Sequence, residues 1–327
     1  MGDHTDYNEG FVLPAAIGLE CIVGARVHDG PVALETLNDV EPEWSRYVDA
    51  VVAALADRGR PDVAIEGLLG SSVPSGSGLS SSAALEVAIA LALCDAAGFE
   101  LDPVQLAVAC QDAEHRATGV PSGIMDQLAS LCGRAQHALL VDCRTFEIAH
   151  VRVPDEIALL VVHSGVPRKL ETSEYAVRRS ECERIADSLG LPALRDATME
   201  QVADEPLARH VVGENARVHA TVEALGAGNL ARLGELFLES HASLRDDYRV
   251  SIPELDALVD ALVESGAAGA RLTGAGFGGC AVAVAERDRA AEILARTVDA
   301  YEPVAGRRVP HWVCEPSAGA GPFERAR

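Results

Sequence analysis

Residues 70–84 read Gly-Ser-Ser-Val-Pro-Ser-Gly-Ser-Gly-Leu-Ser-Ser-Ser-Ala-Ala and run directly into an apolar segment that ends at Gly98. The glycines allow several backbone N–H groups to turn toward one point, where the following helix N-terminus adds a partial positive charge. This pattern predicts a cradle for a di- or triphosphate. It lacks the lysine of a GxxxxGK[ST] loop and the glycine spacing of a dinucleotide fingerprint. A flexible linker is the alternative, which Pro74 and the adjoining helix oppose.

Around this loop the first half of the chain is expected to mix strands and helices. Residues 20–27 and 31–37 flank an Asp29-Gly30 pair and predict a hairpin. An apolar segment that ends at a glycine predicts a buried helix, and Asp102-Pro103 predicts the start of the next one. The expected helices cover residues 44–55, 80–97, 103–118 and 121–131, and the expected strands cover residues 63–69, 138–141 and 148–153.

The second half is expected to open with a buried strand over residues 157–163 and a helix over residues 173–189 that Gly190 ends. Amphipathic helices should follow between residues 198 and 265. Residues 270–272 and 280–284 predict two strands joined by a glycine-rich turn. A chain of 327 residues is long enough for two medium domains, and we place the boundary near residue 155.

The composition excludes several classes of function. The formal charge is −23, from 50 acidic and 27 basic residues, so a nucleic-acid ligand is not expected. There is no apolar run long enough to span a membrane and no signal-peptide pattern at the N-terminus. The eight cysteines form no CxxC pair and show no zinc-ligand spacing. We therefore expect a reduced, cytoplasmic protein.

Two further stretches are unusual. Residues 2–10 read Gly-Asp-His-Thr-Asp-Tyr-Asn-Glu-Gly, and Asp3, His4 and Asp6 could each hold a hydroxyl of a polyol. Taken alone, a polar terminus of this kind is more often solvated and frayed. Residues 272–280 read Leu-Thr-Gly-Ala-Gly-Phe-Gly-Gly-Cys, which by itself indicates no more than a tight turn. Beside the first glycine-rich loop, it could close over or support the phosphates.

Two carboxylates stand at informative positions. Glu114 lies near the end of a predicted helix, and Asp126 about one turn into the next, where the helix field should keep it ionised at neutral pH. A lone carboxylate on a helix is usually solvated. Phosphoryl transfer, however, needs Mg²⁺ held by a carboxylate and a hydroxyl, and a carboxylate that aligns the attacking hydroxyl. With the phosphate cradle, the sequence supplies each of these groups.

Together these stretches resemble the galactokinase family of the GHMP small-molecule kinases. Residues 2–10 are similar to the galactokinase signature, residues 73–84 to the GHMP nucleotide motif, and residues 272–280 to the third GHMP motif. Segments that also agree with galactokinases are residues 44–48, 113–115, 121–127, 173–175 and 243–248. The resemblance spans nearly the whole chain, in order. It implies an α+β, two-domain fold: an N-terminal α/β domain with a mixed sheet (residues 1–155) and a ferredoxin-like C-terminal domain (residues 156–327).

The resemblance also implies roles for individual residues. Asp126 would be the catalytic carboxylate, and Glu114 with Ser82 would hold Mg²⁺, although spacing does not rank Ser82 above Ser80 or Ser81. Trp44 would pack on the adenine, although it could instead be a core residue, as could Tyr175 on its helix. The implied sugar ligands are Asp3, His4, Asp6, Gly123 and Tyr175. The implied phosphate-binding residues are Pro74, Gly76, Ser77, Gly78, Leu79, Ser80, Ser81, Ser82 and Ala83.

The implied activity is transfer of the γ-phosphate of ATP to the C1 hydroxyl of α-D-galactose, with Mg²⁺, in galactose catabolism. ATP and galactose would be the partners of a monomer that binds neither nucleic acid nor membrane. Two alternatives stay open at this point. One is a kinase for a related sugar such as N-acetylgalactosamine or L-arabinose, and the other is a non-catalytic sensor of galactose and ATP.

Three features depart from the family pattern. Asp3 stands where galactokinases usually have glutamate. The family carries a strand and an arginine upstream of Gly2, and this chain begins after both. We therefore expect Met1 to be an internal methionine of a longer protein, and the chain as written to be slow or inactive, because such an arginine is implied to neutralise charge on the transferred phosphate. The connection between Leu37 and Trp44 is also shorter than usual, which should trim only the surface.

Overall fold

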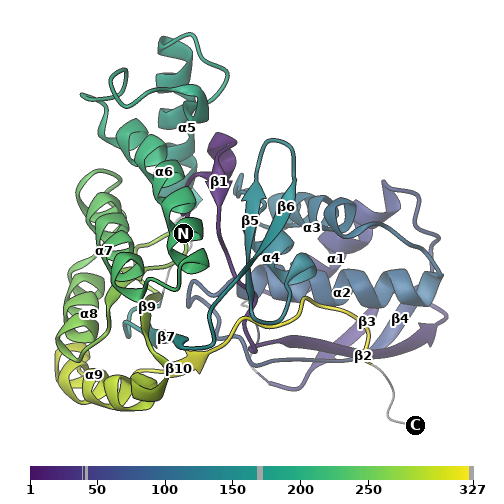
Figure 1. Cartoon of the computed structure of the whole chain (residues 1–327). Helices are drawn as coiled ribbons and strands as arrows, with labels where there is room; N and C mark the ends of the chain where they lie inside the picture. The colour runs from purple at the N-terminus through teal and green to yellow at the C-terminus, as the bar shows by residue number, and fades with distance from the viewer. Residues whose placement is uncertain (39, 41–42, 168–171, 324–327) are drawn as a thin grey trace.

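The computed structural model describes residues 1–38, 40, 43–167 and 172–323. The first and second halves of the chain lie side by side in Figure 1, with the N-terminal strand between them. After its last strand, the chain returns to the first half, where Ser317 and Gly319 make backbone hydrogen bonds to Ala16 and Gly133. In the described part of the chain, no helix combines the length and apolar character that crossing a membrane requires.

The first sheet contains β2 (Cys21–His28), β4 (Ala64–Ser71) and β3 (Ala33–Thr36), in the order β2-β4-β3. Strand β2 runs antiparallel to β4, and β3 runs parallel to it, so the sheet is mixed as predicted. The predicted hairpin is wrong, because β4 lies between the two strands that flank Asp29-Gly30. The close approach of β2 and β4 depends on glycine: a Cβ on Gly67 would lie 2.1 Å from the carbonyl oxygen of Gly24.

Helix α2 (Ser81–Ala97) packs on this sheet, and α1 (Ser45–Ala56) and α3 (Pro103–Thr118) pack on α2 and on each other, so that the helices share one hydrophobic core with the sheet. Helix α2 is apolar on nearly all sides and ends at Gly98, as predicted. Helix α3 begins at a capping box made by Asp102 and Gln105. Helix α4 (Met125–Cys132) begins four residues later than expected, so Asp126 lies at its start and not one turn inside it.

A small antiparallel sheet in the order β1-β5-β6 joins the two halves. It contains β1 (Phe11–Val12), β5 (His137–Asp142) and β6 (Ile148–Arg152), and the last two match the predicted strands. The pairing of β1 with β5 places the preceding residues 2–10, which include the 3₁₀ turn η1 (Asp6–Asn8), in the middle of the molecule. The polar N-terminus is therefore folded and largely buried, not frayed.

The second half is built on a four-stranded antiparallel sheet in the order β10-β7-β9-β8. Its strands are β7 (Ile157–His163), β8 (Gly269–Leu272), β9 (Cys280–Glu286) and β10 (His311–Cys314). Figure 1 shows α7 (Leu230–Asp246), α8 (Pro253–Glu264) and α9 (Ala290–Ala305) together on one side of it. Helices α5 (Thr172–Ser188) and α6 (Pro206–Gly226) and the 3₁₀ turns η2 (Leu194–Asp196) and η3 (Arg287–Arg289) complete the fold.

Most predictions for the second half are confirmed. Strand β7 matches the predicted range, α5 and β8 agree within a residue, and α6 to α8 occupy the region where amphipathic helices were expected. The sequence analysis missed α9 and β10. The domain boundary near residue 155 stays a prediction.

Candidate active site

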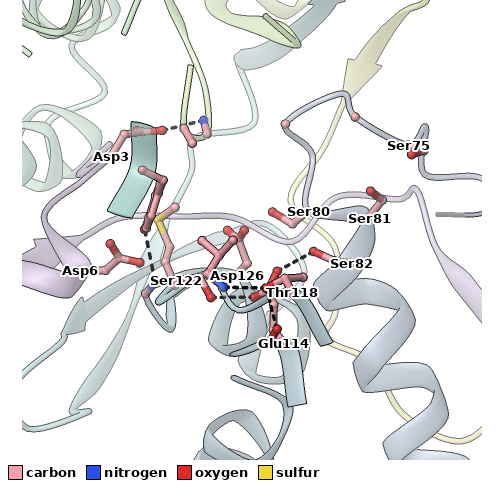
Figure 2. Close-up of a pocket in the computed structure, with 18 of the residues that line it drawn as sticks. Asp3, Asp6, Ser75, Ser80, Ser81, Ser82, Glu114, Thr118, Ser122 and Asp126 are labelled. Carbon is pink, nitrogen blue, oxygen red and sulfur yellow. Dashed lines mark hydrogen bonds between the residues drawn. The ribbon is translucent and has the colours of Figure 1, made fainter. Parts of the chain in front are cut away.

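A cavity of about 380 Å³ opens among segments that lie far apart in the sequence. Figure 2 shows Asp3 and Asp6 at one end of it and the serines at the start of α2 at the other. Three loops contribute to its wall: the N-terminal loop (residues 2–10), the Gly/Ser loop (residues 73–80) and the glycine turn (residues 273–279). The start of α1, helices α2 and α3, the start of α4 with the residues before it, and Tyr175 on α5 complete the described wall.

The Gly/Ser loop has the backbone expected of an anion cradle. Gly76, Gly78 and Ser80 all have positive φ angles, of 65°, 77° and 63°, so the chain turns sharply three times before α2 begins. The Ser77 hydroxyl fixes the loop by donating to the Pro74 carbonyl oxygen at 2.7 Å. In the described structure no side chain caps α2. The N-terminus of this helix, with its partial positive charge, can therefore interact with a phosphate.

The glycine turn packs backbone to backbone on the Gly/Ser loop. A Cβ placed on Gly274 would lie 3.1 Å from the carbonyl oxygen of Gly78, and one on Gly279 would lie 2.6 Å from that of Ser77. Both glycines also have positive φ angles, which L side chains rarely adopt. The turn therefore supports the cradle from behind, and Gly274 and Ala275 line the cavity.

Glu114 is held by three donors. Its Oε1 accepts a hydrogen bond from the Ser82 hydroxyl at 2.9 Å, and its Oε2 accepts from the Ser122 hydroxyl and from Gln127 Nε2, each at 2.9 Å. Gln127 is fully buried and donates a second hydrogen bond to the buried Glu86 at 3.1 Å. Among the three candidate serines, this geometry favours Ser82 as the partner of Glu114.

Asp126 and Asp6 face the same part of the cavity. The Tyr7 N–H donates to Asp6 at 2.9 Å. Burial disfavours the charged form of Asp6, and the nearby charge of Asp126 adds to this, so the pKa of Asp6 rises to about 7. A Cβ on Gly123 would lie 1.6 Å from Asp6 Oδ2, and the Gly123 N–H donates to the Tyr175 hydroxyl at 3.3 Å.

His4 is oriented by two tyrosines. Its Nδ1 lies 2.9 Å from the Tyr7 hydroxyl, which in turn lies 2.6 Å from the Tyr248 hydroxyl. The His4 ring also packs on the ring of Tyr248, with centroids 4.6 Å apart. The imidazole is therefore fixed in position and in hydrogen-bonding direction before any ligand arrives.

Asp3 also lines the cavity, but its carboxylate already has protein partners. Oδ1 accepts from the Gly274 N–H at 2.7 Å, drawn in Figure 2, and Oδ2 accepts from the guanidinium of Arg271. The His210 ring and the Asp3 carbonyl oxygen are 3.1 Å apart. Glu214 accepts from the Gly2 N–H at 3.0 Å. These contacts attach the N-terminal loop to α6 and to strand β8 of the four-stranded sheet.

The structure brings every predicted catalytic, sugar-binding and metal-binding residue to the cavity wall. Of the predicted phosphate-binding residues, Gly76, Gly78, Ser80, Ser81 and Ser82 line it. The described wall does not include Pro74, Ser77, Leu79 and Ala83, nor Trp44, which precedes α1 and packs against the core of the first half. Wall residues to which the sequence analysis gave no individual role are Glu43, Arg46, Ser75, Thr118, Val120, Ser122 and Met125. Gly274 and Ala275 belong to the glycine-rich stretch that it expected beside the phosphates.

Arg46 is the most informative of the missed wall residues. Among the wall residues that the structure describes, it is the only lysine or arginine. It forms an ion pair with Glu43 at 3.0 Å, and both side chains remain partly exposed. The sequence around Arg46 does not predict a place in the cavity wall, because a lone arginine on a helix is usually a solvated surface residue.

Comparison with known proteins places this site in a family. Residues 46–134 match the GHMP kinases N terminal domain, and residues 221–303 match the GHMP kinases C terminal domain. Residues 1–27 match the galactokinase galactose-binding signature. The three matched segments include the N-terminal loop, the Gly/Ser loop and both carboxylates Glu114 and Asp126.

Solved structures agree. The Lactococcus lactis galactokinase, determined in complex with galactose, is 33% identical with a TM-score of 0.90, over 98% of this chain and 91% of that one. The L. major mevalonate kinase is similar in fold, at 21% identity and a TM-score of 0.70 over 98% of this chain and 94% of that one. Homoserine kinase from Cytophaga hutchinsonii has 18% identity and a TM-score of 0.61, over 94% of each chain. The chain thus has the two-domain GHMP kinase fold and belongs to the galactokinase family.

Proposed function

We propose that this protein transfers the γ-phosphate of ATP to the C1 hydroxyl of α-D-galactose and releases ADP and galactose 1-phosphate. The observation that carries the proposal is the shared cavity. It has an anion cradle at the start of α2 at one end and the hydroxyl-binding side chains of the N-terminal loop at the other, with Asp126 among the wall residues. The galactose-binding signature at residues 1–27 supports galactose as the sugar.

Asp126 is the proposed catalytic carboxylate. It orients the sugar hydroxyl for in-line attack on the γ-phosphorus and accepts its proton late, because a loose transition state demands little base strength. The P–O bond to ADP breaks as the new P–O bond forms, so no covalent enzyme intermediate is needed. The nearby Asp6, whose pKa is raised to about 7, accepts hydrogen bonds from the sugar when it is ionised.

His4, Tyr175 and the Gly123 backbone are the other proposed sugar contacts, together with Asp3. His4 is fixed by Tyr7, and Tyr175 is fixed by its hydrogen bond from Gly123. Such fixed polar groups select a sugar by the positions of its hydroxyls, because an unmatched buried donor or acceptor is costly.

Mg²⁺ fits the pair of Glu114 and Ser82. Their oxygens lie side by side at the start of α2, and hard oxygen ligands of this kind suit the ion. Within the described residues no group of three or more His, Cys, Asp or Glu could hold a metal. Magnesium in kinases takes only one or two carboxylates and leaves its other positions to phosphates and water. The bound ion would neutralise charge on the phosphates.

The proposed nucleotide site extends from the cradle toward the start of α1. The Gly/Ser loop and the first turn of α2 would bind the phosphates through backbone N–H groups. Ser77 and Pro74 would act by holding the loop in shape, since their hydrogen bond lies within it. The described cavity wall does not include Trp44, which packs against the core of the first half, and Trp44 remains the proposed adenine contact.

The test is ADP release from Mg·ATP with galactose, N-acetylgalactosamine, L-arabinose or no sugar, with the sugar product identified by ³¹P NMR. We expect galactose to give the highest kcat/KM and a 1-phosphate product. A higher value for either other sugar would replace galactose as the substrate. Binding of galactose and ATP without ADP release would instead support a sensor.

A further inference from the structure

The glycine turn lies between two loops that serve different ligands under the proposed function. On one side the Gly274 N–H donates a hydrogen bond to Asp3 of the N-terminal loop, and on the other Gly274 lies against Gly78 of the Gly/Ser loop. The first loop would bind sugar and the second would bind the phosphates. The backbone of one residue, Gly274, is therefore in contact with both proposed ligand sites.

The contact on the sugar side is unusually well held. The Asp3 carboxylate accepts from the Gly274 N–H at 2.7 Å and from Arg271, which lies two residues before the glycine turn on β8. Asp3 is 3% exposed and Arg271 is 1% exposed. A buried ion pair is a poor source of stability, because desolvation of two charges offsets their attraction. Positioning of the two segments explains its presence better than stability does.

The charges around Arg271 keep this contact in its ionised form. Burial opposes ionisation of Asp3, but the charge of Arg271 and the hydrogen bond it donates outweigh burial, and the pKa of Asp3 is lowered. Glu214 is also fully buried near Arg271, and its pKa is lowered against the effect of burial by Arg271 and Arg217. Arg271 thus compensates two carboxylates that anchor the N-terminal loop, at Asp3 and, through Glu214, at Gly2.

On the phosphate side, the glycine turn and the Gly/Ser loop leave no space for a side chain between them. A Cβ on Gly274 would lie 3.1 Å from the Gly78 carbonyl oxygen, and one on Gly78 would lie 2.9 Å from that of Thr273. The two backbones leave no room for a side chain between them, so a displacement of Gly274 toward Gly78 would press on the Gly/Ser loop. A change in the position of the Gly274 N–H is therefore transmitted to the cradle.

We propose that Asp3 and Arg271 are positioning residues that couple galactose binding to nucleotide binding through Gly274 and Gly78. The inference rests on the proposed function, because it takes galactose and ATP as the two ligands. It extends the role of Asp3 from a sugar contact to the connection between the two sites. Such coupling is reciprocal, so each ligand must tighten the other by the same factor.

The experiment is calorimetric titration of galactose with and without Mg²⁺ and the non-hydrolysable analogue β,γ-imido-ATP. The ratio of the two Kd values is the coupling factor. We expect about tenfold for the wild type, within the usual range for coupled sites, and less than about twofold for Asp3→Asn and Arg271→Met. Arg271→Lys, which keeps the charge but not the planar fork, should fall between them.

The ratio separates positioning from simple contact. If Asp3 only touches the sugar, Asp3→Asn weakens galactose binding equally with and without the analogue, and the coupling factor stays at its wild-type value. That result would overturn the inference. Asp3→Asn is nearly isosteric, and thermal unfolding of each variant identifies any that fails to fold.

Arg195→Met is the matched control. Arg195 forms a two-point ion pair with Asp142 and donates to the Glu9 carbonyl oxygen at 2.9 Å, so it holds the far end of the same loop without touching the glycine turn. Its coupling factor should stay within about twofold of the wild type. An equal loss of coupling in this variant would show a general loosening of the loop and would contradict the inference.

The ADP assay on the wild type separates this inference from the proposed function. ADP release with a coupling factor of one would leave the function standing and remove the inference. Coupled binding without ADP release would support the coupling between the two sites and contradict the proposed kinase function.

Discussion

The Ser82 hydroxyl donates a hydrogen bond to Glu114 Oε1 across 2.9 Å and so joins the first turn of α2 to the last turns of α3. This contact puts a hydroxyl and a carboxylate beside the anion cradle, which is the pair of oxygen ligands that a kinase magnesium ion requires. Ser80 and Ser81 line the same cavity. The contact with Glu114 favours Ser82, among these three serines, as the proposed Mg²⁺ ligand.

Replacement of each serine by alanine tests this ranking. Ser82→Ala should raise the Mg²⁺ concentration for half-maximal rate by at least about tenfold, because outer partners of a metal site alone have effects of that size. Ser80→Ala and Ser81→Ala should change it by less than about threefold. Rates measured over a Mg²⁺ titration provide the check. A larger shift for Ser81→Ala than for Ser82→Ala would assign the ligand to Ser81.

Gln127 should matter for stability as well as for Mg²⁺. It donates to both Glu86 and Glu114 from a fully buried position. Gln127→Leu removes a donor from each carboxylate and should lower the free energy of unfolding by about 1–3 kcal/mol, the usual cost of a lost buried partner. Urea unfolding measures this. Ser122→Ala, which removes one donor from Glu114 alone, should cost less, and an equal cost would contradict the bridging role.

Asp6 makes stability depend on pH. Its pKa is raised to about 7 in the folded protein by burial and by the charge of Asp126, so between its ordinary value of 3.8 and about 7 the folded state binds more protons than the unfolded state. Its contribution to stability is therefore full below the ordinary pKa and is lost as the pH rises through about 7. The Asp6→Asn variant should not show this loss of stability, because an asparagine side chain does not ionise.

Urea unfolding at pH 5.5 and pH 8 checks this prediction. The wild type should lose more stability than Asp6→Asn over that interval. Asp126→Asn removes the neighbouring charge and should move the loss to lower pH. Equal pH dependence in the wild type and in Asp6→Asn would contradict a raised pKa.

Arg46 should contribute to nucleotide binding. It is the only lysine or arginine in the described wall of a cavity that has acidic side chains at several positions. Arg46→Met should raise the KM for ATP about fivefold, the size expected of one partly screened ionic contact, and leave the KM for galactose unchanged. Arg116→Met, which breaks an exposed ion pair with Asp57 outside the cavity, is the control. Equal KM values for ATP in the two variants would exclude Arg46 from the nucleotide site.

Local sequence signals predicted the elements that carry the chemistry. The glycines before α2, the cap of α3 at Asp102 and the stop at Gly98 act within a few residues, so sequence reasoning could read them. The prediction of a hairpin at Asp29-Gly30 is wrong because a turn signal does not show whether another strand lies between the two that flank it. Here β4 lies between β2 and β3 and pairs with both. Helix α4 starts after Gly123, which lies against Asp6, and a contact between segments more than a hundred residues apart leaves no local signal in the sequence.

The buried network around Asp3 could not be predicted at all. Arg271 lies within a short strand where an apolar residue would be the natural expectation, and its partner is 268 residues away. Glu214 and His210 lie on an amphipathic helix, where polar residues usually face solvent. Their roles follow only from the way that β8 and α6 enclose the N-terminal loop.

The most direct test of the central claim is the effect of Asp126→Asn on turnover and on galactose binding in the same preparation. We predict that kcat falls by about 10²–10⁴-fold, as expected for loss of a positioned acid–base group, while the Kd for galactose changes by less than about threefold. Turnover that stays near the wild-type rate would contradict the assignment of Asp126 as the catalytic carboxylate.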